Sequence, residues 1–206
     1  MKTLTNSRIQ SLAVLASFSL LLYSANSLAQ LQSDRIGGAF SLFNGQDTSA
    51  WIQSGNANWY PITDGIAANQ GAGLLIGKFP FSDFQIQFNY WAGKSTQFSI
   101  YIHCADPNYI SSKTALEVNL ASPSFQKYGP GSVVGLLDAA SGLSTANKWN
   151  TVFISSTANQ ITVTLNGITM ADNVNYFNLE NGPFAIRFGG GDLKISNFSA
   201  TIPGRW

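Results

Sequence analysis

The chain has 206 residues, of which 45% are apolar and 10% are charged, and its formal net charge is +1. That length is enough for one domain with a sizeable core, and the composition is the reverse of that of a disordered chain. The near-neutral charge argues against nucleic acid as a partner, which requires a basic surface. It also argues against electrostatic docking on a membrane.

Residues 1–29 are expected to be a cleaved signal peptide and not part of the fold. Lys2 and Arg8 supply the positive charge, and the apolar stretch that follows is too short to span a bilayer. Ala29 is a small residue of the kind that precedes a cleavage site. We therefore expect one domain over residues 30–206, periplasmic or secreted and without membrane insertion. After cleavage, 9 basic residues face 10 acidic ones, because the removed segment carries 2 of the 11 basic residues and none of the acidic ones.

Stretches in which apolar and polar residues alternate follow one another along the chain, which is typical of β-strands with one buried face. They cover residues 84–91, 97–104, 115–120, 149–156, 161–172, 183–188 and 192–200. Asn166-Gly167 divides the fifth stretch as a hairpin turn, because both residues tolerate positive φ. The pattern predicts an all-β protein of about ten to thirteen strands in one antiparallel sandwich. Residues 121–131 form the longest irregular connection, either a functional loop or a solvated connector.

The single histidine and the single cysteine are adjacent, and the alternation places them on opposite faces of one strand. Cys104 shares its face with Phe98, Ile100 and Ile102, so we expect a buried thiol that packs as a small apolar residue. One cysteine cannot form an internal disulfide. His103 is expected on the opposite face.

The polar faces of several strands are expected to merge into one patch. It would hold aromatic rings, a carboxylate, an imidazole, an amide and a guanidinium, from Trp91, Tyr101, His103, Glu117, Asn119 and Arg187. This mixture suits a glycan, because rings stack on the C–H face of a sugar and polar groups bond its hydroxyls. Each residue alone is also compatible with a solvated surface role or a weak surface ion pair. The expected convergence on one face favours a site.

A divalent metal ion is a second hypothesis for this patch, as a cofactor. One histidine and one glutamate fall short of the three protein ligands that a catalytic zinc ion usually has. Asp106 or Asp138 could complete such a site, but the pattern does not place them. The chain contains no G-x-S-x-G, P-loop or H-E-x-x-H motif.

The order of several segments resembles the family of 3-keto-disaccharide hydrolases, also known as domain of unknown function 1080. The segments are "FSLFNGQDTSAW", "WYPITDGIAA", "GLLIGKFPFSDFQIQFNY", "FSIYIHCADP", "ALEVNL", "GLLDAASG", "NKWNTVFISSTANQITVTLNG" and "GPFAIRFGGGDLKISNFSA". The resemblance covers residues 40–200 and implies a concanavalin-like, laminin-G-like jelly roll. It also implies an exported bacterial enzyme that acts on glycosides oxidised to a ketone at C3. A base removes the C2 proton, and the anomeric substituent then leaves.

The resemblance places Glu117 at the position of the family's strand glutamate, and Glu117 and His103 would transfer the proton. Arg187 and Tyr101 would polarise the ketone or orient the sugar. Trp91 would stack on the sugar, and the amide of Asn119 would bind it.

Two positions depart from the family's pattern. His103 stands where many members have arginine, and Ala121 follows the "EVNL" strand, which often ends in an acidic residue in the family. These departures leave two alternatives, a changed substrate with His103 as base or a non-catalytic carbohydrate-binding domain. A structural or adhesive surface protein is a third, because laminin-G-like folds serve many functions.

Overall fold

The computed structural model describes residues 39–43, 45, 48–121, 128–139, 142–177, 179 and 181–203. The expected signal peptide and residues 122–127 of the irregular connection lie outside these ranges. Within the ranges, there is no helix with the length and apolar character needed to cross a membrane.

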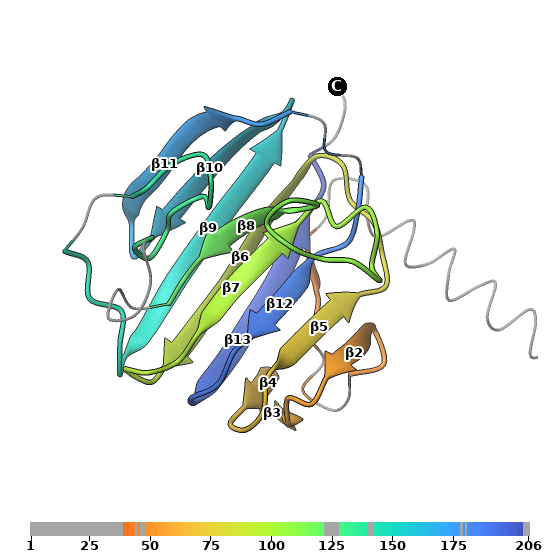
Figure 1. Cartoon of the computed structure of the whole chain (residues 1–206), viewed down its shortest axis with the longest axis vertical. Helices are drawn as coiled ribbons and strands as arrows, with labels where there is room; N and C mark the ends of the chain where they lie inside the picture. Colours follow the sequence, from red (N-terminus) through yellow and green to blue (C-terminus); the bar gives the residue numbers. More distant parts are fainter. Residues whose placement is uncertain are drawn as a thin grey trace, which may run out of the picture.

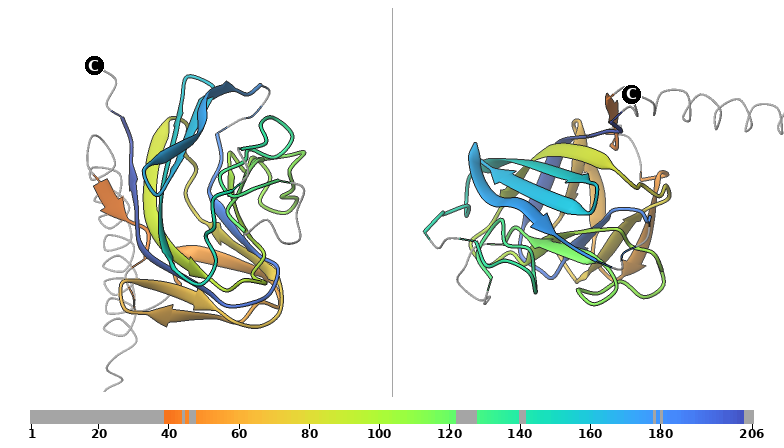
Figure 2. Two further views of the ribbon diagram at one scale, coloured as in Figure 1. Left: turned by 90° about the vertical axis from the view of Figure 1, so that its left-hand side faces the viewer. Right: turned by 90° about the horizontal axis from the view of Figure 1, so that it is seen from above.

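The described residues form two antiparallel sheets. The strands of the larger sheet are β1 (Ala39–Ser41), β3 (Trp59–Ile62), β4 (Gly65–Ala68), β6 (Phe84–Ala92), β9 (Trp149–Thr157), β10 (Gln160–Leu165), β11 (Ile168–Asn175) and β13 (Leu193–Thr201). Their spatial order is β11-β10-β9-β6-β13-β4-β3, and β1 also pairs with β13. The smaller sheet consists of β2 (Trp51–Gly55), β5 (Gly73–Gly77), β12 (Ala185–Phe188), β7 (Phe98–Ile102) and β8 (Leu116–Asn119), in that spatial order. Figure 1 labels the strands, and Figure 2 shows the two sheets as stacked layers.

The core lies between the sheets, because each strand turns alternate residues inward. In β6, Phe84 and Phe88 are fully buried whereas Gln85 and Gln87 are exposed. Phe84 packs edge-on against Phe184 of the segment leading into β12, with ring centroids 4.6 Å apart. Each such buried aromatic side chain contributes about 1.5–3 kcal/mol, so the aromatic core can stabilise a fold that has no disulfide among its described residues.

The predicted antiparallel sandwich is confirmed, and the thirteen strands in the described ranges fall within the expected number. The predicted hairpin turn is confirmed as well, because Asn166 and Gly167 have φ values of 53° and 79°. Ala158 and Asn159 form a second turn with φ values of 51° and 61°, which the sequence did not indicate because alanine seldom adopts positive φ. The alternation also missed β1 to β5, which are only three to five residues long.

Candidate functional site

Three of the six predicted patch residues lie together on the outer face of the smaller sheet. Tyr101 in β7 pairs with Glu117 in β8, and Arg187 in β12 pairs with Ser99, two residues before Tyr101 in β7. Their neighbours Ile100, Val118 and Ile186 face the core. The expectation that these three strands share a sheet is therefore confirmed, and it brings a phenol, a carboxylate and a guanidinium to one surface.

A hollow of about 220 Å³ opens on this surface. Its lining residues come from β5, β7 and β12 with their flanking residues and from the connection after β7, and they are Ala72, Gly73, Leu74, Tyr101, Ile110, Arg187, Phe188 and Gly189. We call it the Tyr101 hollow. The alternation did not reveal Leu74 and Ile110, because β5 is short and Ile110 lies in an irregular connection. Both side chains pack against Tyr101 and its buried neighbours, so they give a polar site an apolar wall.

Tyr101 lies on the strand between those of the two charged groups, because β7 pairs with β12, which carries Arg187, and with β8, which carries Glu117. The tyrosine side chain is only 6% exposed. Burial raises the pKa of Tyr101 well above its ordinary value, and the negative charge of Glu117 raises it further, whereas Arg187 opposes the shift. Tyr101 is therefore a neutral hydrogen-bond donor at physiological pH, placed between a potential base and a fixed cation.

Asn119 lies beside Glu117 on the same strand, but its amide serves the fold. Its Nδ2 donates to the carbonyl oxygens of Tyr128 at 2.7 Å and Gly129 at 3.2 Å, and its Oδ1 accepts from the backbone N–H of Ala121 at 3.3 Å. The side chain is fully buried. The expected contact between Asn119 and a substrate is therefore not supported, and the amide instead anchors the chain that follows β8.

The prediction that Trp91 belongs to this patch is wrong. Trp91 lies in β6 of the larger sheet, whose core-facing residues include Phe88 and Tyr90. Its ring is therefore on the outer face of the opposite layer, where Lys194 Nζ lies 5.5 Å from the ring centroid. Alternation reveals which residues of a strand share a face, but it does not reveal which sheet the strand joins.

The prediction that His103 faces outward with Tyr101 is also wrong. β7 ends at Ile102, and His103 has φ of +57°, which breaks the alternation and turns its side chain inward. His103 Nε2 lies 2.9 Å from Ser156 Oγ and 2.8 Å from the Tyr176 hydroxyl oxygen, and these two oxygens are 2.8 Å apart. All three side chains are buried. We call them the His103 corner.

Cys104 is buried, as predicted, but on the other side of the strand. The reversal at His103 places Cys104 beside Tyr101 and Ala185. Phe98, Ile100 and Ile102, with which it was expected to share a face, lie on the core side of the strand. Burial raises the pKa of its thiol to about 12. The backbone of Gly182 packs against Cys104 so closely that an added Cβ would lie 2.5 Å from the Cys104 carbonyl carbon, so a glycine is required at that position.

The described residues do not bring three histidine, cysteine, aspartate or glutamate side chains together as a metal site. Asp106 Oδ1 accepts from the backbone N–H of Asn108 at 2.9 Å, and Asp138 Oδ1 accepts from Ser132 Oγ at 3.1 Å. Both carboxylates therefore stabilise local loops. Glu117 and His103 point to opposite sides of the smaller sheet, so they do not form a shared site.

Comparison with known protein families gives one match over most of the chain. Residues 38–200 match the profile of the 3-keto-alpha-glucoside-1,2-lyase-like domain. The comparison with curated proteins gives no match.

Solved structures with a similar fold share little sequence with this chain. A protein of Parabacteroides distasonis named "putative glycosyl hydrolase" has a TM-score of 0.67 at 15% identity, with 80% of this chain and 93% of that chain covered. The carbohydrate-binding module CBM66 of Bacillus subtilis has a TM-score of 0.58 at 13% identity, covering 74% and 95%. The β-glucanase of Bacillus licheniformis has 0.54 at 13% identity, covering 81% and 98%. These structures confirm the concanavalin-like jelly roll, and the family match indicates a carbohydrate-related role.

Proposed function

This chain belongs to the family of 3-keto-alpha-glucoside-1,2-lyase-like domains, and on that premise we propose that it cleaves glycosides whose sugar carries a ketone at C3. The observation that carries the proposal is the grouping of Glu117, Tyr101 and Arg187 beside an open hollow. A base, a neutral donor and a permanent cation are the groups that this chemistry needs.

The reaction is an elimination across C1 and C2 of the sugar. The ketone at C3 acidifies the C2–H bond, because the electron pair left at C2 is delocalised onto the ketone oxygen. The carboxylate of Glu117 takes the C2 proton, a double bond forms between C1 and C2, and the C1–O bond breaks. The leaving oxygen takes up a proton to become an alcohol, and addition of water across the new double bond completes a hydrolysis.

The other two side chains act on the developing negative charge. Arg187 carries a charge at every physiological pH, and its guanidinium would face the ketone oxygen as that oxygen becomes an enolate. Tyr101 is a neutral donor on the strand beside Glu117, and its hydroxyl would donate to the sugar. Donors fixed in a partly buried site stabilise such charge more than donors in water.

The test is release of an aryl alcohol from soluble aryl 3-keto-glycosides, with the unoxidised glycosides as controls and with chelator in parallel samples. Glu117→Gln should lower turnover by about 10²–10⁴-fold, the usual contribution of a general base. Asp172→Asn is the matched control, because Asp172 is an exposed carboxylate on β11 and lies outside the Tyr101 hollow. Equal turnover of oxidised and unoxidised glycosides, or full activity of Glu117→Gln, would contradict the proposal.

A carbohydrate-binding domain without catalysis is the second candidate. The burial of His103 favours it, because among the described residues Glu117 is then the one predicted proton-transfer group that remains beside the Tyr101 hollow. This candidate predicts saturable binding of a glycan that Arg187→Met abolishes, with no product released over long incubation.

We further propose that the protein acts outside the cytoplasm, in the periplasm or after secretion. The support is the sequence of residues 1–29, which lie outside the described residues. The mass of the protein recovered from the cell envelope and from the medium tests it. A mature chain that begins at Gln30 is expected, and retention of the uncleaved chain in the cytoplasm would contradict the proposal.

A further inference from the structure

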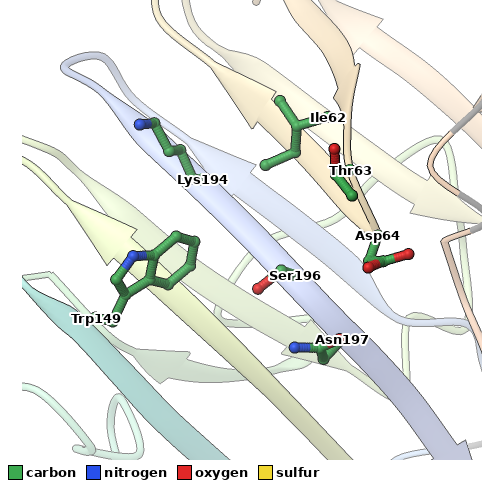
Figure 3. A pocket seen from close by; sticks show the side chains of 7 residues that line it. All are labelled: Ile62, Thr63, Asp64, Trp149, Lys194, Ser196 and Asn197. Carbon is green, nitrogen blue, oxygen red and sulfur yellow. The ribbon is translucent and has the colours of Figure 1, made fainter.

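A second hollow, of about 360 Å³, lies on the outer face of the larger sheet. Its lining residues come from the β3–β4 hairpin, β9 and β13, and they are Ile62, Thr63, Asp64, Trp149, Lys194, Ser196 and Asn197. Figure 3 shows Trp149 on one side and Thr63 and Asp64 on the other, with the residues of β13 between them. We call it the Trp149 hollow. It belongs to a different layer from the Tyr101 hollow, so it needs an explanation of its own.

One aromatic ring on this face is available to a ligand and another is occupied. Trp149 in β9 pairs with Trp91 in β6, and Trp91 pairs with Lys194 in β13, so the three residues form one row across the sheet. Lys194 lies over the Trp91 ring, a contact that holds the ammonium group in place. Trp149 is 52% exposed. The row therefore ends in an open indole ring with a fixed cation nearby.

The backbone on the far side of the hollow departs from regular strand geometry. The pairing of β13 with β6 shifts between Ser196 and Ser199, and Asn197 has φ of +52°. Asp64, in the turn between β3 and β4, has φ of +54°, and its carbonyl oxygen accepts from the Asn197 N–H at 3.0 Å. A bulge of this kind redirects a side chain. Asn197 is exposed and lines the hollow, whereas the next residue, Phe198, is buried in the core.

The chemistry of these groups matches a neutral sugar. An exposed indole offers a flat apolar surface to the C–H face of a pyranose. Asp64 accepts hydrogen bonds from hydroxyl groups, and Lys194 and Asn197 donate them. One carboxylate and one ammonium group balance each other, which disfavours a polyanion. Neighbouring strands lie about 4.8 Å apart, so the distance from β9 to β4 across β6 and β13 is roughly 14 Å. That span is long enough for an oligosaccharide.

We propose that the Trp149 hollow is a second carbohydrate-binding site that takes a neutral glycan chain, with one sugar ring stacked on Trp149. The site is independent of the reaction proposed for the Tyr101 hollow, because the two hollows open on the outer faces of opposite sheets. It would hold the protein on a polysaccharide while the Tyr101 hollow stays accessible to small glycosides.

The test is binding of the full chain to soluble polysaccharides, measured by retardation in native gels that contain dextran, laminarin, xylan or levan, with heparin as the polyanion. Wild type should be retarded by at least one neutral polymer and not by heparin. Trp149→Ala should weaken that binding at least tenfold, and Asp64→Ala should weaken it severalfold. Phe177→Ala is the matched control, because Phe177 is an aromatic residue with 77% exposure that does not line the hollow.

The outcomes separate this site from the Tyr101 hollow. Glu117→Gln should keep polysaccharide binding, and Trp149→Ala should keep any turnover of small aryl 3-keto-glycosides. The proposal is overturned if no neutral polymer retards the protein, if heparin competes with the neutral polymer, or if Trp149→Ala and Phe177→Ala weaken binding equally. Loss of binding in Glu117→Gln alone would show that the Tyr101 hollow is the glycan site, and would also overturn it.

Discussion

The His103 corner and the Tyr101 hollow both gather polar side chains, but the surroundings of these side chains differ. In the corner, an imidazole and two hydroxyls bond one another at 2.8–2.9 Å and are all buried. At the hollow, Arg187 lines an open volume, and both Arg187 and Glu117, the strand partner of Tyr101, are only partly buried. Polar groups that satisfy one another inside the protein stabilise the fold, whereas groups beside an opening can bind a ligand. The two regions should therefore respond oppositely to substitution.

The largest effect on stability is expected at the corner. His103→Ala removes a buried ring and leaves the Ser156 and Tyr176 hydroxyls without it, which should lower the free energy of unfolding by about 2–4 kcal/mol. Urea unfolding measures this change. Any turnover by the folded fraction should stay close to that of wild type. A variant with unchanged stability and lost turnover would break the comparison and assign His103 to the reaction.

Raising the pH should lower the free energy of unfolding through the thiol of Cys104, the residue that follows His103. The pKa of Cys104 is raised from 9.0 to about 12 in the folded chain, so its contribution is complete below about pH 9. Between about pH 9 and pH 12 the unfolded chain loses this proton while the folded chain keeps it, and stability falls by up to about 1.4 kcal/mol per pH unit. Urea unfolding of wild type and Cys104→Ala at several alkaline pH values should show a shallower decline for the variant. Rapid alkylation of the folded thiol near neutral pH would contradict this.

A smaller effect, on activity alone, is expected in the hollow. Tyr101→Phe removes the hydroxyl on the strand beside Glu117 but keeps the ring that packs against Cys104 and Ala185. Turnover of 3-keto-glycosides should fall about tenfold, equivalent to about 1.4 kcal/mol in the barrier, with a change in unfolding free energy below about 1 kcal/mol. A large loss of stability at unchanged turnover would show that Tyr101 stabilises the fold, as the His103 corner does, and does not act in the reaction.

The smallest effect on stability is expected at Ala158, in the turn between β9 and β10. Ala158 has φ of +51°, a conformation that glycine adopts without strain, so Ala158→Gly should stabilise the fold by up to about 1 kcal/mol. Thermal unfolding measures it, and turnover should not change because the hairpin is remote from the Tyr101 hollow. Destabilisation would show that the flexibility of glycine in the unfolded chain outweighs the relieved strain.

Alternation predicted the sandwich and most of its longer strands, because it depends on burial of one strand face. It also brought Tyr101, Glu117 and Arg187 together, since each lies within a strand of the smaller sheet. It failed for Trp91, because sheet membership depends on long-range pairing that the local pattern does not contain. It failed for His103, because a single positive φ reverses the order of faces. The resemblance supplied the jelly roll and the carbohydrate role that the pattern alone could not.

The Trp149 hollow was missed for a related reason. Trp149 begins β9, Asp64 lies in a hairpin turn, and Asn197 lies in a bulge. Asp64 and Asn197 do not follow the period of a regular strand, and the alternation of β9 does not show which strands lie beside Trp149. Their convergence is therefore visible only once the pairing of β13 with its neighbours is known.

The reversed backbone at His103 limits the design of substitutions from a sequence alignment. An alignment matches positions by their order along the chain, and an arginine written into position 103 would appear to restore a surface cation. Because φ is +57° there, the guanidinium would instead enter the enclosed interior beside Phe84, where an unpaired charge is strongly unfavourable. To place a cation at this end of β7, a designer would first have to change the direction of the backbone.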